Sequence, residues 1–320
     1  RSAESGTRPL HSMKRPPHCT HRAPFRIQQV PLSALLLLLL LPTLRSMAAP
    51  PPALLRIPRI GLGTFQLKGD VAKGAVLEGL KQGFRLVDTA RVYRNEESIG
   101  EALKEAEEKL GIRREEVFVT SKIGPGDQGY DKAIAACEES LRLLGTDYLD
   151  LLLIHWPGQA KIPSDSPTNR DARQESWRAL EHLLEAGRVR HIGVSNFEPP
   201  HLKQLLEGAV VKPLVNQVEL HPLHYQQGLV SLCRSHGILV QSYSPLGSPE
   251  GFPTLSALPA VAEAAEKHGC STARVLLGWS LRMSDSTLVR TDKPDHMGDA
   301  IAALGLADEM EEAWVERISE

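Results

Sequence analysis

The stretch AIAACEESLRLLGTDYLDLLLI, residues 133–154, predicts a helix, a turn and a strand in succession. In its first half small and apolar residues recur at helical spacing, and Gly145 after Leu144 is a common stop signal for a helix. Its second half ends in the leucine-rich run Leu149 to Ile154, in which Asp150 is the one polar residue, and such a run is typical of a strand buried on both faces. Such strands occur in parallel sheets covered by helices, so the stretch predicts one repeat of an α/β fold.

The same alternation of strand and helix continues from Leu55 to the end of the chain. Helical patterns at Glu96 to Leu110 and at Trp177 to Leu184 are each followed closely by a glycine. Eight alternations over roughly 250 residues predict a (β/α)8 barrel. The expected strands are Arg59 to Phe65, Arg85 to Asp88, Val117 to Thr120, Leu149 to Ile154, His191 to Asn196, Leu214 to Leu220, Ile238 to Ser244 and Ser286 to Arg290.

A doubly wound open sheet is the structural alternative. That fold usually carries a phosphate-binding glycine fingerprint after its first strand. Here Gly61-Leu62-Gly63 lacks the third glycine and opens no helix immediately. The sequence therefore favours the barrel.

The composition of the 320-residue chain narrows the class of protein. A hydrophobic share of 42% with 24% charged residues is ordinary for a globular protein. A formal net charge of -2 argues against a nucleic-acid-binding protein, which needs a basic excess. Neither metal-ligand spacing nor a disulfide framework is evident in the four cysteines, which are predicted to be reduced and buried: Cys19, Cys137, Cys233 and Cys270.

The first 54 residues are predicted to lie outside the fold, with the barrel domain spanning residues 55–320. A basic, proline-rich head precedes seven leucines, Leu35 to Leu41, and small residues follow, so residues 13–49 have the order of a targeting signal for an organelle or the secretory route. The apolar stretch is too short and interrupted to span a bilayer stably. The alternative is that upstream sequence was translated and Met47 is the true start, which predicts a cytoplasmic protein.

Polar residues occur at the C-terminal ends of the expected strands, where barrel enzymes hold their catalytic groups. Asp88, Lys122 and His155 end the second, third and fourth strands. Each alone has a structural explanation, as a helix cap, a solvated charge or a core histidine, but their joint placement at one face favours a functional site. Further polar residues at this face are Tyr93, Ser195, Asn196, Gln217, Tyr243 and Ser244.

These groups together suggest a particular chemistry. The ammonium of Lys122 beside Tyr93 favours the phenolate and so lowers the phenol's pKa, and Asp88 supplies the countercharge that a buried lysine needs. Such a tyrosine can protonate a developing alkoxide, and His155 adds a second hydrogen-bonding group. Neither a nucleophile paired with a base nor a cluster with metal-ligand spacing is evident. Carbonyl reduction with an external hydride donor remains.

The motifs resemble the aldo-keto reductase family from about Ile57 to the C-terminus. Three segments are similar to segments of that family and lie at similar spacing. They are Asp88-Thr89-Ala90 with Tyr93 and Asn95-Glu96, Thr120-Ser121-Lys122, and Leu153-Ile154-His155-Trp156-Pro157. Further matches are residues 127–130, 193–197, 216–219 and 243–247. Their combination resembles the soluble, monomeric branch that reduces small aldehydes, keto sugars and diketo acids. The short tail from Trp314 implies a broad substrate range.

The resemblance implies an NADPH-dependent aldehyde reductase, of the alcohol dehydrogenase (NADP+) type, with NADH as a possible second cofactor. Tyr93 would be the proton donor, Lys122 and Asp88 its tuning pair, and His155 the group that orients the carbonyl. The walls of the substrate pocket would be Phe65 and Trp156, for which the alternative is a place in the core. The implied cofactor contacts are Thr64, Ser195, Asn196, Gln217, Tyr243, Ser244, Leu246, Arg290, Thr291 and His296. Of these, Ser195, Asn196 and Gln217 would hold the nicotinamide carboxamide, and Tyr243 would stack on its ring.

One segment departs from the family pattern. Arg290 stands in the place of the usual lysine, His296 in that of an arginine, Asp299-Ala300 in that of Glu-Asn, and Gly278 in that of an arginine before Trp279. A free histidine, with a pKa of about 6.5, is mostly neutral at pH 7 and therefore attracts a 2'-phosphate only weakly. NADPH is therefore expected to be preferred over NADH by a reduced margin, which widens as the pH falls.

Two other classes of function fit parts of the pattern. Some barrels of this family are cofactor-occupied regulatory subunits, although the intact tetrad and the absence of an added interaction domain speak against that alternative. The second is a Schiff-base enzyme that uses Lys122 as its nucleophile, which borohydride trapping of a substrate on that lysine would reveal.

Overall fold

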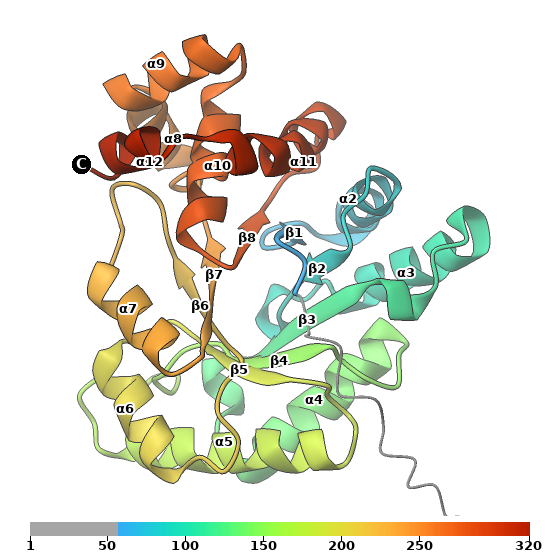
Figure 1. The fold of residues 1–320 in the computed structure, drawn as a ribbon. Coiled ribbons are helices and arrows are strands. Elements are labelled where there is room, and N and C mark those ends of the chain that lie inside the picture. Colours follow the sequence, from blue (N-terminus) through green and yellow to red (C-terminus); the bar gives the residue numbers. More distant parts are fainter. Residues whose placement is uncertain (1–56) are drawn as a thin grey trace, which may run out of the picture. The chain divides into compact units, whose positions relative to one another are not determined.

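Eight parallel strands close into a barrel in the computed structural model, which describes residues 57–320 (Figure 1). Each strand pairs with the next in the chain, and β8 pairs with β1. This confirms the predicted (β/α)8 barrel and excludes the open sheet. The strands are β1 (Ile60–Gly63), β2 (Leu86–Asp88), β3 (Phe118–Ile123), β4 (Leu151–Ile154), β5 (Ile192–Ser195), β6 (Val215–Glu219), β7 (Leu239–Tyr243) and β8 (Ser286–Val289).

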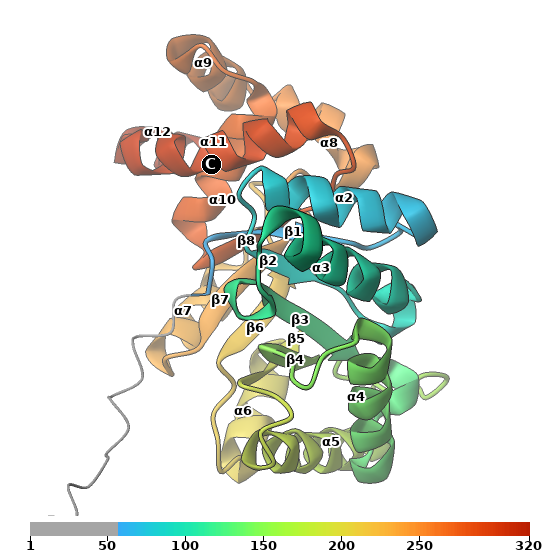
Figure 2. The ribbon, with the colours of Figure 1, turned by 90° about the vertical axis from the view of Figure 1, so that its right-hand side faces the viewer.

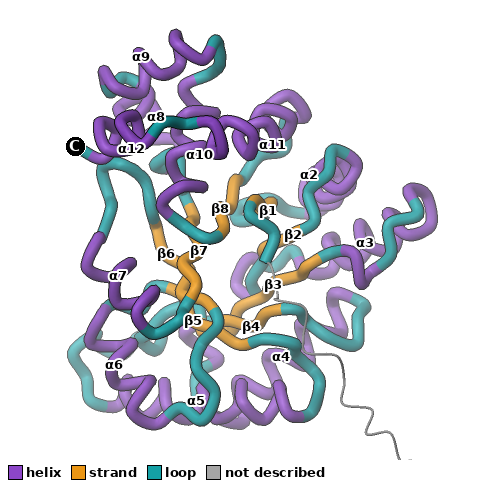
Figure 3. Tube along the Cα trace, viewed as in Figure 1, coloured by secondary structure: helices purple, strands orange, loops and turns teal. Residues whose placement is uncertain are grey.

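Helices surround the strands on the outside of the barrel (Figure 3). Neighbouring helices pack in sequence order, as α2, α3 and α4 do in Figure 2. Between β7 and β8 the chain forms three helices instead of one. The α-helices are α2 (Gly69–Lys81), α3 (Glu96–Leu110), α4 (Tyr130–Leu144), α5 (Thr168–Glu185), α6 (Pro199–Gly208), α7 (Gln227–Ser235), α8 (Ser248–Ser256), α9 (Pro259–His268), α10 (Thr272–Met283), α11 (Pro294–Glu309) and α12 (Glu312–Ser319); short 3-10 turns are η1 (Arg91–Tyr93), η2 (Arg114–Glu116) and η3 (Pro125–Asp127).

Helix α5 begins at Thr168, nine residues before the predicted Trp177. Its first half buries polar side chains at helical spacing, Asn169, Arg173 and Ser176, and all three form hydrogen bonds. A search for apolar periodicity does not detect a buried face made of such residues. The prediction was wrong here because hydrogen-bonded polar groups take the place of apolar ones.

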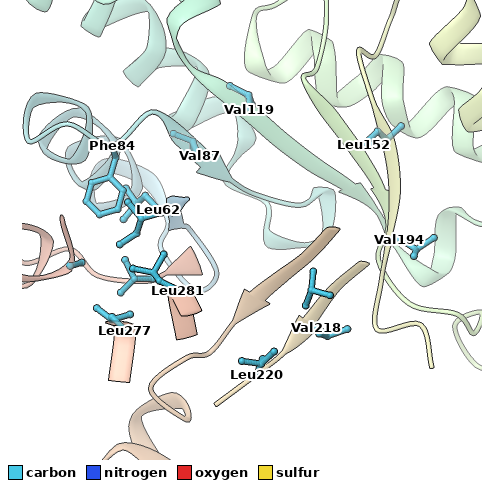
Figure 4. Close-up of a cluster of buried hydrophobic side chains, with 14 of the residues drawn as sticks. Leu62, Phe84, Val87, Val119, Leu152, Val194, Val218, Leu220, Leu277 and Leu281 are labelled. Carbon is cyan, nitrogen blue, oxygen red and sulfur yellow. The ribbon is translucent and has the colours of Figure 1, made fainter. Parts of the chain in front are cut away.

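The alternation of side chains along each strand divides the core into two layers. One layer packs between strands and helices and includes Leu62, Val87 and Leu152 (Figure 4). A smaller cluster, with Leu86 and Leu153, fills the barrel interior. The interior is tight, because a Cβ on Gly61 would lie 2.3 Å from a methyl carbon of Leu86. A larger residue at that position of β1 would therefore force the side chains of Leu86 and Leu288 to move.

The alternation of side chains along each strand also positions the polar residues at the C-terminal ends of the strands. Side chains two residues apart in a strand point to the same face. Asp88 therefore follows Leu86 on the inner face of β2, and His155 follows Leu153 at the end of β4. Strand pairing sets Ser195 beside Gln217 on the neighbouring strands β5 and β6. Polar groups thus gather at the C-terminal mouth above an apolar interior.

The cysteine prediction is confirmed in part. Cys137 and Cys233 are buried and free, whereas Cys270 is only half-buried. Cys270 follows Gly269, which ends α9 in a left-handed conformation, so it lies in a surface turn. The prediction of a buried side chain was wrong there, and Cys19 lies outside the described residues.

Nothing in residues 57–320 tests the predictions for the head. Among the helices of that range, none has the length and apolar character to cross a membrane. The targeting signal, the Met47 alternative and the boundary after residue 54 fall on residues outside the described range. They stay predictions, as do the compartment and the monomeric state.

Candidate active site

A cavity of about 1000 Å³ opens at the C-terminal ends of the strands. Tyr93 and His155 line it from the loops after β2 and β4. Arg290 and Lys293 line it from the segment that joins β8 to α11, and His296 lines it from the first turn of α11. This volume lies at the upper end of the range for ligand sites, and the position is the one at which barrel enzymes act. All the predicted site residues line the cavity except Thr64 and Lys122.

Lys122 lies beneath the cavity in a buried ion pair with Asp88. Its ammonium Nζ is 2.5 Å from Asp88 Oδ1 and donates a second bond to the carbonyl of Thr89 at 2.9 Å. The other carboxylate oxygen of Asp88 accepts a hydrogen bond from Gln217 at 2.8 Å. Burial lowers the pKa of Lys122, but Asp88 and Tyr93 outweigh burial and the pKa is raised overall. Lys122 is therefore a fixed positive charge below the cavity.

Tyr93 extends from the loop after β2 to this charge. Its hydroxyl oxygen lies 3.5 Å from Lys122 Nζ. Burial raises the pKa of Tyr93, and Asp88 raises it further, against the opposing effect of Lys122. The expectation of a lowered phenol pKa was wrong in this respect, because desolvation outweighs the ammonium. The phenol consequently keeps its proton at neutral pH and is ready to donate it.

His155 faces the same part of the cavity. Its ring centroid lies 5.6 Å from that of Tyr93, nearly edge-on. Burial, assisted by the positive charge of Lys122, lowers the pKa of His155 to about 3. Its Nδ1 atom is buried without a hydrogen-bond partner among the described residues. A neutral imidazole carries one N–H, which can donate to a substrate oxygen.

The predicted nicotinamide contacts lie together, connected by hydrogen bonds. Asn196 adopts a left-handed backbone with φ of 61°, and its side chain donates to the carbonyl of His155 at 3.0 Å and accepts from the hydroxyl of Tyr243 at 2.8 Å. Gln217 donates to Gln241 on β7 at 2.7 Å. Sequence reasoning missed Gln241, although it precedes Tyr243 by two residues and therefore shares its inward face.

Two large aromatic side chains form apolar walls. Phe65 is 53% exposed and Trp156 is 47% exposed, and both line the cavity. The alternative that they belong to the core is wrong. The ring centroid of Phe65 lies 5.1 Å from that of Tyr93, so this wall adjoins the phenol. Val92, 49% exposed beside Tyr93, adds an apolar surface that the sequence analysis did not single out.

Thr64 lies behind the cavity lining. Its side chain is fully buried and donates a hydrogen bond to the backbone oxygen of Asp88 at 2.9 Å. This bond fixes the end of β2 against the end of β1. A cofactor contact by Thr64 stays a prediction.

The segment that departs from the family pattern has mixed charges. Arg290, Lys293 and His296 line the cavity there, together with the carboxylates of Asp292 and Asp299. Gly278 is buried in α10, and a Cβ at that position would lie 3.2 Å from the end of Met310. The side chain of Met310 thus packs against the position at which the family often has an arginine.

The cavity has the features that a nicotinamide dinucleotide requires. Ser195, Asn196, Gln217 and Tyr243 line the same cavity as Tyr93 and His155, as a carboxamide and its ring need. The cations Arg290 and Lys293 lie in another part of the lining, as a phosphate needs. The residues present therefore fit this class of cofactor.

Comparison with known proteins identifies the family. Residues 59–319 match the Aldo/keto reductase family. The chain belongs to the aldo-keto reductases. Among curated proteins it is 42% identical to the glyoxal reductase of Bacillus subtilis over 238 residues, which cover 74% of this chain and 79% of that protein. It is 41% identical to the 9,11-endoperoxide prostaglandin H2 reductase of Trypanosoma cruzi over 237 residues, 74% of this chain and 78% of that one.

Solved structures agree with this assignment. The aldo-keto reductase MGS-M4 from a Medee basin deep-sea metagenome library superposes with a TM-score of 0.75 at 35% identity, covering 82% of this chain and 91% of that one. A variant of Gox0644 in complex with NADPH superposes with a TM-score of 0.72 at 34% identity, covering 82% and 89%. Members of the family are oxidoreductases that use NADPH to reduce small-molecule carbonyl compounds. The predicted family, fold and cofactor class are therefore confirmed.

Proposed function

We propose that this aldo-keto reductase is an aldehyde reductase of the alcohol dehydrogenase (NADP+) type, in which Tyr93 donates the proton. The observation that carries the proposal is the buried pair of Lys122 and Asp88 beneath the phenol of Tyr93, with the ring of His155 beside it. A relative with the name glyoxal reductase supports a small aldehyde as the substrate.

In the proposed reaction NADPH supplies a hydride to the carbonyl carbon. Negative charge then develops on the carbonyl oxygen, and the hydroxyl of Tyr93 transfers its proton to that oxygen to give the alcohol. Lys122 stabilises the resulting tyrosinate, and Asp88 keeps Lys122 in place. The N–H of His155 donates a hydrogen bond to the same oxygen and so orients the carbonyl.

The proposed cofactor contacts follow the cavity lining. We assign Ser195, Asn196 and Gln217 to the carboxamide and the ring of Tyr243 to the nicotinamide, because all four residues line the cavity. Arg290 and Lys293 provide cations for the 2'-phosphate. Further contacts are assigned to Ser244, Leu246, Thr291 and His296, which line the same cavity.

The proposal is tested by turnover. Purified protein is mixed with NADPH and a reactive aldehyde such as nitrobenzaldehyde, and loss of NADPH absorbance is followed. We expect steady oxidation of NADPH with formation of one alcohol for each NADPH consumed. Binding of NADPH without oxidation would support the regulatory subunit instead. Covalent trapping of a carbonyl compound on Lys122 by borohydride would support a Schiff-base enzyme, which needs a neutral amine where this structure raises the pKa of Lys122.

The pH profile of carbonyl reduction should be nearly flat between about pH 5 and pH 9. His155, with its pKa lowered to about 3, stays neutral across that range. Tyr93, with its pKa raised above the ordinary value of about 10, stays protonated and loses its proton only in more alkaline solution. kcat/KM should therefore fall only above about pH 10. With NADPH at saturating concentration, an inflection near pH 7 in kcat/KM for the carbonyl substrate would contradict these protonation states.

Arg290→Ala should raise KM for NADPH by about 10- to 100-fold, because a charge-assisted bond to the 2'-phosphate is lost. KM for NADH, which lacks that phosphate, serves as the internal control and should change little. His296→Arg should act in the opposite direction and widen the preference for NADPH. If the wild-type protein prefers NADH, the assignment of Arg290 is wrong.

A further inference from the structure

The part of the cavity lined by β8 and α11 has nearly balanced charges. Arg290 and Lys293 supply two cations, and Asp292 and Asp299 supply two carboxylates. A 2'-phosphate carries up to two negative charges at neutral pH, so an unneutralised carboxylate beside it would oppose binding. How each carboxylate is paired therefore bears on cofactor preference.

Asp299 forms an ion pair with Arg274. The two residues lie on α11 and α10, which pack side by side (Figure 1). Arg274 Nη2 is 2.6 Å and Nε is 2.7 Å from Asp299 Oδ1. The hydroxyl of Ser271 donates to the other carboxylate oxygen. Both oxygens of Asp299 thus accept hydrogen bonds, one from Arg274 of α10 and the other from Ser271, the residue before that helix.

The pair has a defined geometry because Ser271 also fixes α10. The Oγ of Ser271 accepts a hydrogen bond from the backbone N–H of Arg274 at 3.0 Å and so caps the helix. The side chains of Arg274 and Asp299 are 33% and 23% exposed, so solvent screens this pair less than a fully exposed one. Asp299 is among the residues that line the cavity, whereas Arg274 is not.

We propose that Arg274 determines specificity for the phosphorylated cofactor by neutralising Asp299. Without Arg274, the two cations of the lining would face two uncompensated carboxylates. The 2'-phosphate would then add little to the binding free energy of the cofactor. With Arg274, the three cations Arg274, Arg290 and Lys293 outnumber the carboxylates of Asp292 and Asp299 in this segment. Arg274 acts through Asp299 and is a positioning residue, and this inference rests on the proposed use of NADPH.

The test isolates the adenosine portion of the cofactor. Adenosine 2',5'-bisphosphate and adenosine 5'-monophosphate differ by the 2'-phosphate alone, and their Kd values for the full chain can be measured by titration calorimetry. Arg274→Gln should weaken binding of the bisphosphate by about tenfold and leave the monophosphate within about twofold, because only the former meets the exposed charge of Asp299. Adding Asp299→Asn to that variant should restore most of the preference, since the amide carries no charge.

Arg282→Gln is the matched control. Arg282 lies on the same helix and forms an exposed ion pair with Glu312, away from the cavity lining. This variant should leave both Kd values unchanged, and thermal denaturation of all variants shows whether each one folds.

Three outcomes would overturn the inference. Equal weakening of both ligands by Arg274→Gln would indicate a structural role alone. An unchanged preference in Arg274→Gln would show that Asp299 does not sense the phosphate. Failure of Asp299→Asn to restore the preference would indicate that Arg274 itself binds the phosphate. If the wild-type chain does not prefer the bisphosphate, the proposed use of NADPH is wrong. If the wild-type chain prefers it but the variants behave otherwise than expected, only the role of Arg274 is wrong.

Discussion

Tyr93→Phe should lower kcat for carbonyl reduction by about 10² to 10⁴-fold, the usual cost of losing a general acid. The substitution removes the proton but keeps the ring that packs against Phe65. The Kd for NADPH, measured by fluorescence titration, should therefore change by less than about threefold, since the loss is confined to the reaction step.

Tyr243→Phe is the matched control for this experiment. Tyr243 lines the same cavity, but its hydroxyl donates to Asn196 and burial raises its pKa to about 12. The Tyr243→Phe variant should weaken cofactor binding more than it lowers kcat. If Tyr93→Phe retained near-full turnover, or if Tyr243→Phe lost as much kcat, the assignment of the proton donor would be wrong.

Lys122→Met should impair stability and activity together. Breaking one side of a buried ion pair costs about 3–5 kcal/mol, because Asp88 is left as an uncompensated buried charge. For a domain of this size the midpoint of thermal unfolding should fall by roughly 10 °C. Turnover should fall as well, because the tyrosinate loses the charge that stabilises it.

The double variant Asp88→Asn with Lys122→Met separates the two effects. It leaves no unpaired charge, and an asparagine can still accept the hydrogen bond from Gln217. Its thermal midpoint should recover most of the loss, whereas kcat should stay low. A double variant that regained turnover along with stability would show that the pair has only a structural role.

Much of the fold and of the site was predictable because the evidence is local in sequence. Apolar runs and the glycines after helices predicted the eight strands. The strand ends then placed Asp88, Lys122 and His155 at one mouth. The motif spacing identified the family, although the roles of its residues here still rest on geometry and on the experiments proposed.

Other features depend on how distant parts of the chain pack. The pKa of Tyr93 is set by its burial against neighbouring loops, which spacing in the sequence does not give, so the sequence analysis had the wrong net direction. The ion pair of Arg274 and Asp299 joins two helices and has no local pattern. The start of α5 was missed because its buried face is polar.

The most direct test of hydride transfer to a carbonyl uses NADPH with both hydrogens at C4 of the nicotinamide replaced by deuterium. The full chain is incubated with this cofactor and a small aldehyde, and the alcohol is analysed by mass spectrometry. The expected product carries one deuterium on its carbinol carbon for each NADPH oxidised. An alcohol without deuterium, or bound cofactor that is never oxidised, would contradict the assignment of this chain as a carbonyl reductase.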